Sequence, residues 1–132
     1  AACSAVRAEM LARVQGQGSV WHDPHNNGTY SIVDDNSPGE LTLSRLTGEF
    51  AFTDMMAFVF EATGDAKCTV HGCSQSQGAS FLDKSTNYCN LRMLYCGTAS
   101  GCKAVESDFA FEETSVSGSV GAGNDPSKCL KV

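Results

Sequence analysis

Seven cysteines in a chain of 132 residues constrain this fold more than any other feature of the sequence. Such a density is unusual among reducing thiols and typical of proteins from oxidising compartments. Structural zinc is the alternative, but no two cysteines have the Cys-x2-Cys spacing of common zinc sites. We therefore expect disulfides, formed outside the cell or in an oxidising organelle lumen. The positions are Cys3, Cys68, Cys73, Cys89, Cys96, Cys102 and Cys129.

An odd number of cysteines leaves one thiol outside the disulfides, either buried and inert or available for a bond to another chain. One local pair can be proposed. Cys96 and Cys102 flank a short segment with a glycine at each end, and glycines let the chain reverse and bring the two α-carbons within the roughly 4.4–6.8 Å that a disulfide needs. The other pairings and the identity of the unpaired cysteine stay open.

Length and composition indicate one domain with a single hydrophobic core. Apolar residues make up 42% of the chain and charged residues 18%, and acidic residues outnumber basic ones to give a formal net charge of −6. The basic residues form no cluster, so we exclude nucleic acid as a partner. The longest apolar run, residues 55–60, is too short to span a membrane. Residues 1–4 lack the features of a signal peptide, and we expect that such a segment has already been removed.

An amphipathic helix is predicted within residues 1–18, because apolar residues recur there at every fourth position and glycines follow. Charged side chains occupy other positions of this helix. We expect Glu9 and Arg13, which are among them, to face away from the core. The apolar positions are Val6, Met10 and Val14.

Between residues 28 and 116 the pattern changes to short apolar segments separated by turn residues, which predicts a β-rich core. The first two segments form a predicted hairpin, and the third is a predicted central strand covered on both faces. A short helix is favoured over a strand near residues 87–95. Residues 107–116, with Phe109 and Phe111, are a predicted edge strand. The predicted strands are 29–33, 41–46, 50–62, 67–71 and 107–116.

The predicted fold class is therefore mainly β with a flanking N-terminal helix. It is a single antiparallel sheet or a small barrel, stapled by about three disulfides. Residues 117–132 form a predicted C-terminal tail, which a bridge from Cys129 would hold. We treat residues 1–132 as a single extracytoplasmic, disulfide-stabilised domain.

Several stretches of the chain resemble small secreted cysteine-rich proteins of marine microalgae and related protists. They are residues 21–30 (WHDPHNNGTY), 43–48 (LSRLTG), 73–77 (CSQSQ) and 85–96 (STNYCNLRMLYC). The resemblance covers most of residues 21–105. It implies an extracytoplasmic domain and assigns no catalytic residue.

The segment His22-Asp23-Pro24-His25 is the strongest candidate for chemistry. Two imidazoles three residues apart, with a carboxylate between them, can bind a transition metal or supply a general base oriented by an acid if the chain turns there. His71, the one other histidine, is the candidate third ligand. The alternative, which we favour, is a polar connection between helix and sheet.

The sequence contains no Gly-x-Ser-x-Gly motif and no glycine-rich phosphate loop, so we expect no cofactor. A cysteine nucleophile needs a free thiol, and most of these thiols should be bridged. Asn27 begins an Asn-Gly-Thr sequon and is a candidate glycosylation site. Four aromatic residues are candidates either for a sugar-stacking surface or for the edge of the core. They are Trp21, Tyr30, Tyr88 and Tyr95.

Together these observations favour a non-catalytic interaction or assembly domain, secreted or lumenal. It would be a structural subunit or a protein- or glycan-binding module, whose unpaired cysteine could join two copies or attach it to a larger assembly. One alternative is a small metal-assisted hydrolase or lyase that uses residues 22–25. Another is a small-ligand carrier, in which a barrel closes around aromatic residues, although a chain of this size needs those residues for its own core. The aromatic residues in question are Phe58, Phe60, Phe109 and Phe111.

Overall fold

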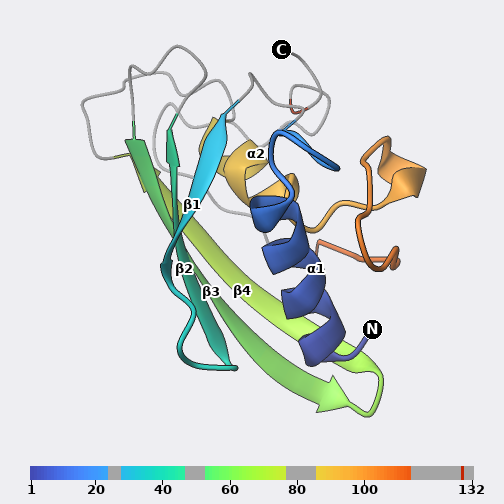
Figure 1. The fold of residues 1–132 in the computed structure, drawn as a ribbon. Helices are drawn as coiled ribbons and strands as arrows, with labels where there is room; N and C mark the ends of the chain where they lie inside the picture. The colour runs from blue at the N-terminus through green and yellow to red at the C-terminus, as the bar shows by residue number, and fades with distance from the viewer. Residues whose placement is uncertain (24–27, 47–52, 77–85, 114–128, 130–132) are drawn as a thin grey trace.

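Four antiparallel strands form one sheet in the order β1-β2-β3-β4, and two helices lie on the same face of it (Figure 1). The computed structural model describes residues 1–23, 28–46, 53–76, 86–113 and 129. Together with three disulfides, this arrangement confirms the predicted fold class, and the described strands form an open sheet rather than a barrel. The elements are α1 (Cys3–Gln15), β1 (Thr29–Asp34), β2 (Glu40–Leu46), β3 (Thr53–Gly64), β4 (Lys67–Ser76), α2 (Thr86–Arg92) and the short 3₁₀ helix η1 (Thr98–Ser100).

The main core lies between the sheet and α1. Leu41 of β2 lies opposite Phe58 of β3, and Leu43 lies opposite Met56, so the apolar residues of both strands share one face. These side chains are buried and pack with the apolar stripe of α1. The prediction that β3 is covered on both faces is wrong. Burial alternates along the strand, and Val59 on the other face is 46% exposed.

The helix α1 is buried on two sides. Its apolar stripe packs on the sheet as expected. The prediction that Glu9 and Arg13 face away from the core is wrong, because Glu9 is fully buried and Arg13 is 1% exposed. The carboxylate of Glu9 accepts hydrogen bonds from the backbone N–H groups of residues 105–107, at 2.6–2.9 Å. Arg13 donates from Nε to Glu9 at 2.6 Å and from Nη1 to the carbonyl oxygen of Met93 at 3.0 Å. The C-terminal half of the chain therefore covers this second side.

The C-terminal half contains the predicted short helix, α2, but not the predicted edge strand. Residues 107–113 are irregular and pair with no described strand. One reason is that the N–H of Ser107 is already bound by the side chain of Glu9. Residues 114–116 of that predicted strand lie outside the described residues. β4, in turn, continues past its predicted end at residue 71 to Ser76.

Three disulfides hold these elements together and leave Cys73 as the free thiol. All seven cysteines lie within the described residues. One bridge closes the local loop expected from the sequence, and the other two join segments far apart in the chain. The bridges are Cys3–Cys68, Cys89–Cys129 and Cys96–Cys102.

Candidate functional site

The histidine segment that was the candidate metal or catalytic site is divided between surface and core. His22 is exposed, whereas Asp23 is buried and its Oδ2 accepts a hydrogen bond from Nε of Arg45 at 2.7 Å. Pro24 and His25 lie outside the described residues. The carboxylate that was expected to orient a histidine is therefore engaged in an ion pair with β2.

His71, the candidate third ligand, lies on β4 on the face of the sheet opposite the helices. It is opposite Val59 in the register, and its Nε2 lies 3.4 Å from Oε2 of Glu61. The side chains of His71 and Glu61 are both largely exposed. Within the described ranges, no three His, Cys, Asp or Glu side chains are grouped closely enough to hold a metal ion.

Asp23 and Arg45 belong to a buried polar cluster that joins β1, β2, β3 and α2. The guanidinium of Arg45 lies 5.7 Å from the centroid of the Tyr30 ring. The Tyr30 hydroxyl donates to the backbone carbonyl of Asn90 at 2.7 Å, and Nδ2 of Asn90 donates to Oδ2 of Asp54 at 2.7 Å. Burial and the charge of Asp23 raise the pKa of Tyr30 well above its ordinary value, so the hydroxyl remains a donor. The cluster therefore has a structural role.

A structural role for Asp23 predicts that Asp23→Asn lowers the free energy of unfolding by about 2 kcal/mol, because the buried guanidinium of Arg45 loses the counter-charge to which it is hydrogen-bonded and keeps that of Asp54. Urea unfolding of the oxidised protein measures this loss. Asp35→Asn is the matched control, since Asp35 is exposed, and it should shift the midpoint little. Equal midpoints for both variants would contradict the structural role.

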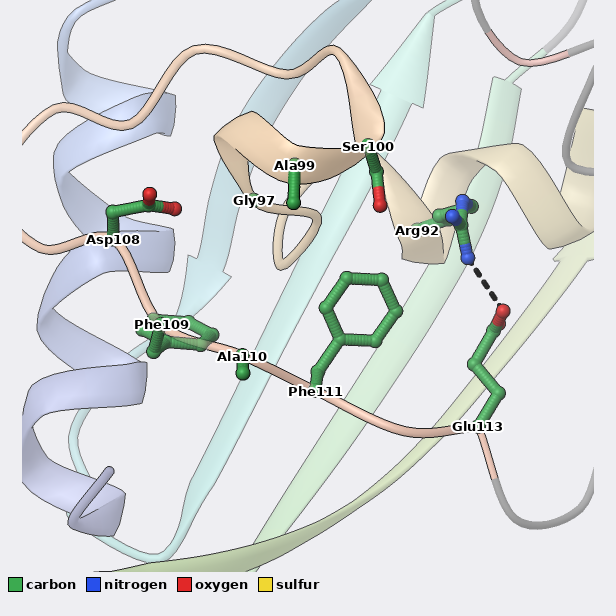
Figure 2. Close-up of a pocket in the computed structure, with 9 residues that line it drawn as sticks. All are labelled: Arg92, Gly97, Ala99, Ser100, Asp108, Phe109, Ala110, Phe111 and Glu113. Carbon is green, nitrogen blue, oxygen red and sulfur yellow. Dashed lines mark hydrogen bonds and ion pairs between the residues drawn. The ribbon is translucent and has the colours of Figure 1, made fainter.

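A groove of about 520 Å³ lies between η1 and residues 108–113. Figure 2 shows the Phe111 ring rising toward η1, with the hydroxyl of Ser100 directed toward it. The ion pair between Arg92 and Glu113 closes one end of the groove, and Asp108 stands at the other.

The polar groups at the first end of the groove bind one another. The carboxylate of Glu113 accepts hydrogen bonds from Arg92 at 2.5 Å, from the Tyr88 hydroxyl at 2.6 Å and from the Tyr95 hydroxyl at 2.8 Å. Burial and the hydrogen bond to Glu113 raise the pKa of Tyr88 to about 12, and the same two causes raise the pKa of Tyr95. Both hydroxyls therefore stay protonated, and they fix residues 108–113 against α2.

The other end of the groove lacks the features of a catalytic acid. Asp108 accepts hydrogen bonds from the hydroxyl and the backbone N–H of Thr98, and these lower its pKa. A general acid at neutral pH needs the opposite shift. Among the described residues that line the groove there is no histidine and no cysteine. Asp108 therefore acts as a hydrogen-bond acceptor that ties residues 108–113 to η1.

The aromatic residues considered for sugar stacking or for a ligand cavity are mostly packed inside the protein. Tyr95 packs edge-on against Phe111, with ring centroids 5.1 Å apart. Phe109 packs against the main core and Phe111 against a second cluster around Cys89, so the four phenylalanines do not enclose one space. The buried members of both sets are Trp21, Tyr30, Phe58, Phe60 and Tyr88.

The face of the sheet opposite the helices carries a strip of residues that includes the free thiol. Cys73 of β4 lies opposite Ala57 of β3, and His71 lies opposite Val59. Except for the half-buried Ala57, these side chains are exposed. Alanine is small, so it leaves space beside the thiol. We call these four residues the outer strip.

Some predicted features lie outside the described residues, and Asn27 of the sequon is one of them. No helix within the described ranges combines the length and the apolar character needed to cross a membrane.

Comparison of the chain with protein-family models, curated proteins and solved structures found no match.

Proposed function

We propose that this protein is a non-catalytic interaction domain of an oxidising compartment, outside the cell or in an organelle lumen, and that it serves as an assembly subunit through its outer strip. The observation that carries the proposal is the state of the seventh cysteine. Six cysteines are bridged, whereas Cys73 is free and exposed on a strand of the sheet.

The position of Cys73 favours a bond to another chain. A thiol kept in an oxidising compartment is either protected by burial or exposed to disulfide exchange. Cys73 has no burial to protect it, and its neighbours in the outer strip are the small Ala57 and the exposed Val59.

A protein partner is better supported than a glycan. Sugar-binding surfaces use exposed aromatic faces, and the candidate rings Trp21, Tyr30 and Tyr88 are buried. The non-catalytic part of the proposal is supported by the engagement of Asp23 with Arg45 and by the low pKa of Asp108. These carboxylates act as fixed acceptors rather than as proton donors.

The test is the state of Cys73 in protein isolated from its source without reductant, with free thiols alkylated at the first step. We expect peptide mass spectrometry to find Cys73 in a disulfide to another polypeptide. Non-reducing and reducing gels should then show different mobilities. The bridged Cys96 serves as an internal control, because it should escape alkylation whatever the state of Cys73. Complete alkylation of Cys73 in a monomer would contradict the proposal.

A further inference from the structure

We infer that the partner at the outer strip is a second copy of this chain. The two β4 strands pair in antiparallel fashion about a two-fold axis at Cys73, and a Cys73–Cys73 disulfide closes the pair. The inference rests on the proposed function and specifies its partner and its geometry.

The two edges of the sheet differ in a way that favours β4 as the pairing strand. β1 is one edge, and a bulge between Ile32 and Asp34 interrupts its ladder. Bulges, prolines and charged side chains are the usual means of protecting an edge from pairing. β4 is the other edge of the described sheet, and its ladder with β3 is regular from Cys68 to Ser76. Residues 69–76 contain no proline and no Lys, Arg, Asp or Glu.

The geometry of an antiparallel pair brings two copies of Cys73 within bonding distance. A two-fold axis at this residue places it opposite itself, and directly opposed residues have α-carbons about 4.5 or 5.5 Å apart, depending on the hydrogen-bonding pattern. Both separations lie within the roughly 4.4–6.8 Å range of disulfides. The bond therefore forms without displacement of either backbone.

The same axis brings no like charges together. It places His71 opposite position 75 of the second copy, and Gly72 opposite position 74. None of these positions is Lys, Arg, Asp or Glu, and His71 does not face its own copy. Self-pairing also accounts for the odd cysteine count, because a different partner would need an unpaired cysteine of its own.

Bond formation requires a disulfide oxidant, for which oxidised glutathione is the probe. The Cys73 thiolate attacks it, forming a mixed disulfide and releasing one glutathione thiolate. The Cys73 thiolate of the second copy then attacks the Cys73 sulfur and releases the second glutathione thiolate, and the two protons lost by the Cys73 thiols pass to the released thiolates. Two Cys73 thiols are thereby oxidised and one glutathione disulfide is reduced to two thiols.

The test compares the full-length oxidised chain with the variant C73S/H71C during incubation with oxidised glutathione. Position 71 lies on the same strand and the same exposed face as Cys73, but in the proposed register the two copies of this position are about 13 Å apart along the strands. We expect non-reducing gels to show a wild-type dimer of twice 13.9 kDa. The variant should cross-link about tenfold more slowly or not at all. Hydrogen exchange of residues 70–76 should be slower in the dimer than in monomeric C73S.

The possible results test the strand-paired dimer and the assembly role of Cys73 separately. Equal rates of cross-linking for wild type and variant, or unchanged exchange in β4, would overturn the strand-paired dimer while leaving an assembly role for Cys73. A Cys73 that accepts only glutathione would also overturn it. If protein isolated from its source carries Cys73 bridged to a different polypeptide, the second-copy inference is overturned, whereas the proposed function is supported.

Discussion

Replacing Glu9 with alanine should lower the free energy of unfolding by about 4 kcal/mol, because it leaves a buried arginine without its counter-charge and three partly buried backbone N–H groups without their acceptor. Glu9 accepts hydrogen bonds from Arg13 and from the backbone of residues 105–107. It is the main described link between α1 and that segment. Denaturant unfolding of the oxidised protein, followed by circular dichroism, measures the loss.

Two further variants distinguish the buried carboxylate from a general effect of charge. Glu61→Ala removes an exposed carboxylate on β3 and should change the stability by less than about 0.5 kcal/mol. The double variant E9A/R13A should lose less stability than the sum of the losses in the two single variants. Each single variant leaves the partner's charge buried without its counter-charge, whereas the double variant removes both charges. Strictly additive losses would contradict the coupling of Glu9 to Arg13.

The same carboxylate should make stability depend on pH. Burial opposes ionisation of Glu9, but the hydrogen bonds from Ser107, Arg13, Val105 and Glu106 outweigh it and lower its pKa from 4.5. A lowered pKa in the folded state contributes stability above the unfolded value, and that contribution is lost as the pH falls through the folded value. The difference in stability between wild type and Glu9→Gln should therefore be greatest above pH 4.5 and shrink on acidification. A difference that stays constant to low pH would contradict this role.

Removal of the Cys3–Cys68 bridge in the variant C3A/C68A should cost about 4 kcal/mol. The bridge spans 65 residues, and in the chain-entropy model a longer closed loop restricts the unfolded state more strongly. The matched control is C96A/C102A, whose bridge spans only 6 residues and should cost about 2 kcal/mol. Chemical denaturation without reductant measures both losses. If the shorter loop cost as much as the longer one, loop entropy would not explain the stabilisation.

The strands could be predicted from the sequence because they are local patterns. In residues 41–43 apolar and polar residues alternate, and the turn-forming residues 34–39 precede them, so the hairpin of β1 and β2 needed no information from elsewhere. The end of β4 was missed for the opposite reason. Its last residues are polar, and they are strand because β3 supplies their partners, as in the pair Asp54 and Ser76.

The charged residues of the core could not be predicted in the same way, because their burial depends on contacts between distant segments. Glu9 and Arg13 lie on the expected polar side of α1, and their contacts with residues 93–107 make that side interior. The sequence did contain a signal for the buried polar cluster that includes Arg45 and Asp54. Arg45 continues the inward positions of β2 and Asp54 those of β3, and the register places these opposite charges face to face. Pairing the two strands before assigning the faces would have found it.

The pattern of the disulfides has a consequence for biosynthesis. One bridge lies wholly within residues 1–76 and the other two within residues 86–129, so no covalent link crosses from one half to the other apart from the chain itself. During vectorial synthesis the first half can oxidise before the cysteines of the second half have emerged. Native pairing is then a choice among three thiols, followed by a choice among the four new thiols and the free Cys73, instead of one choice among all seven.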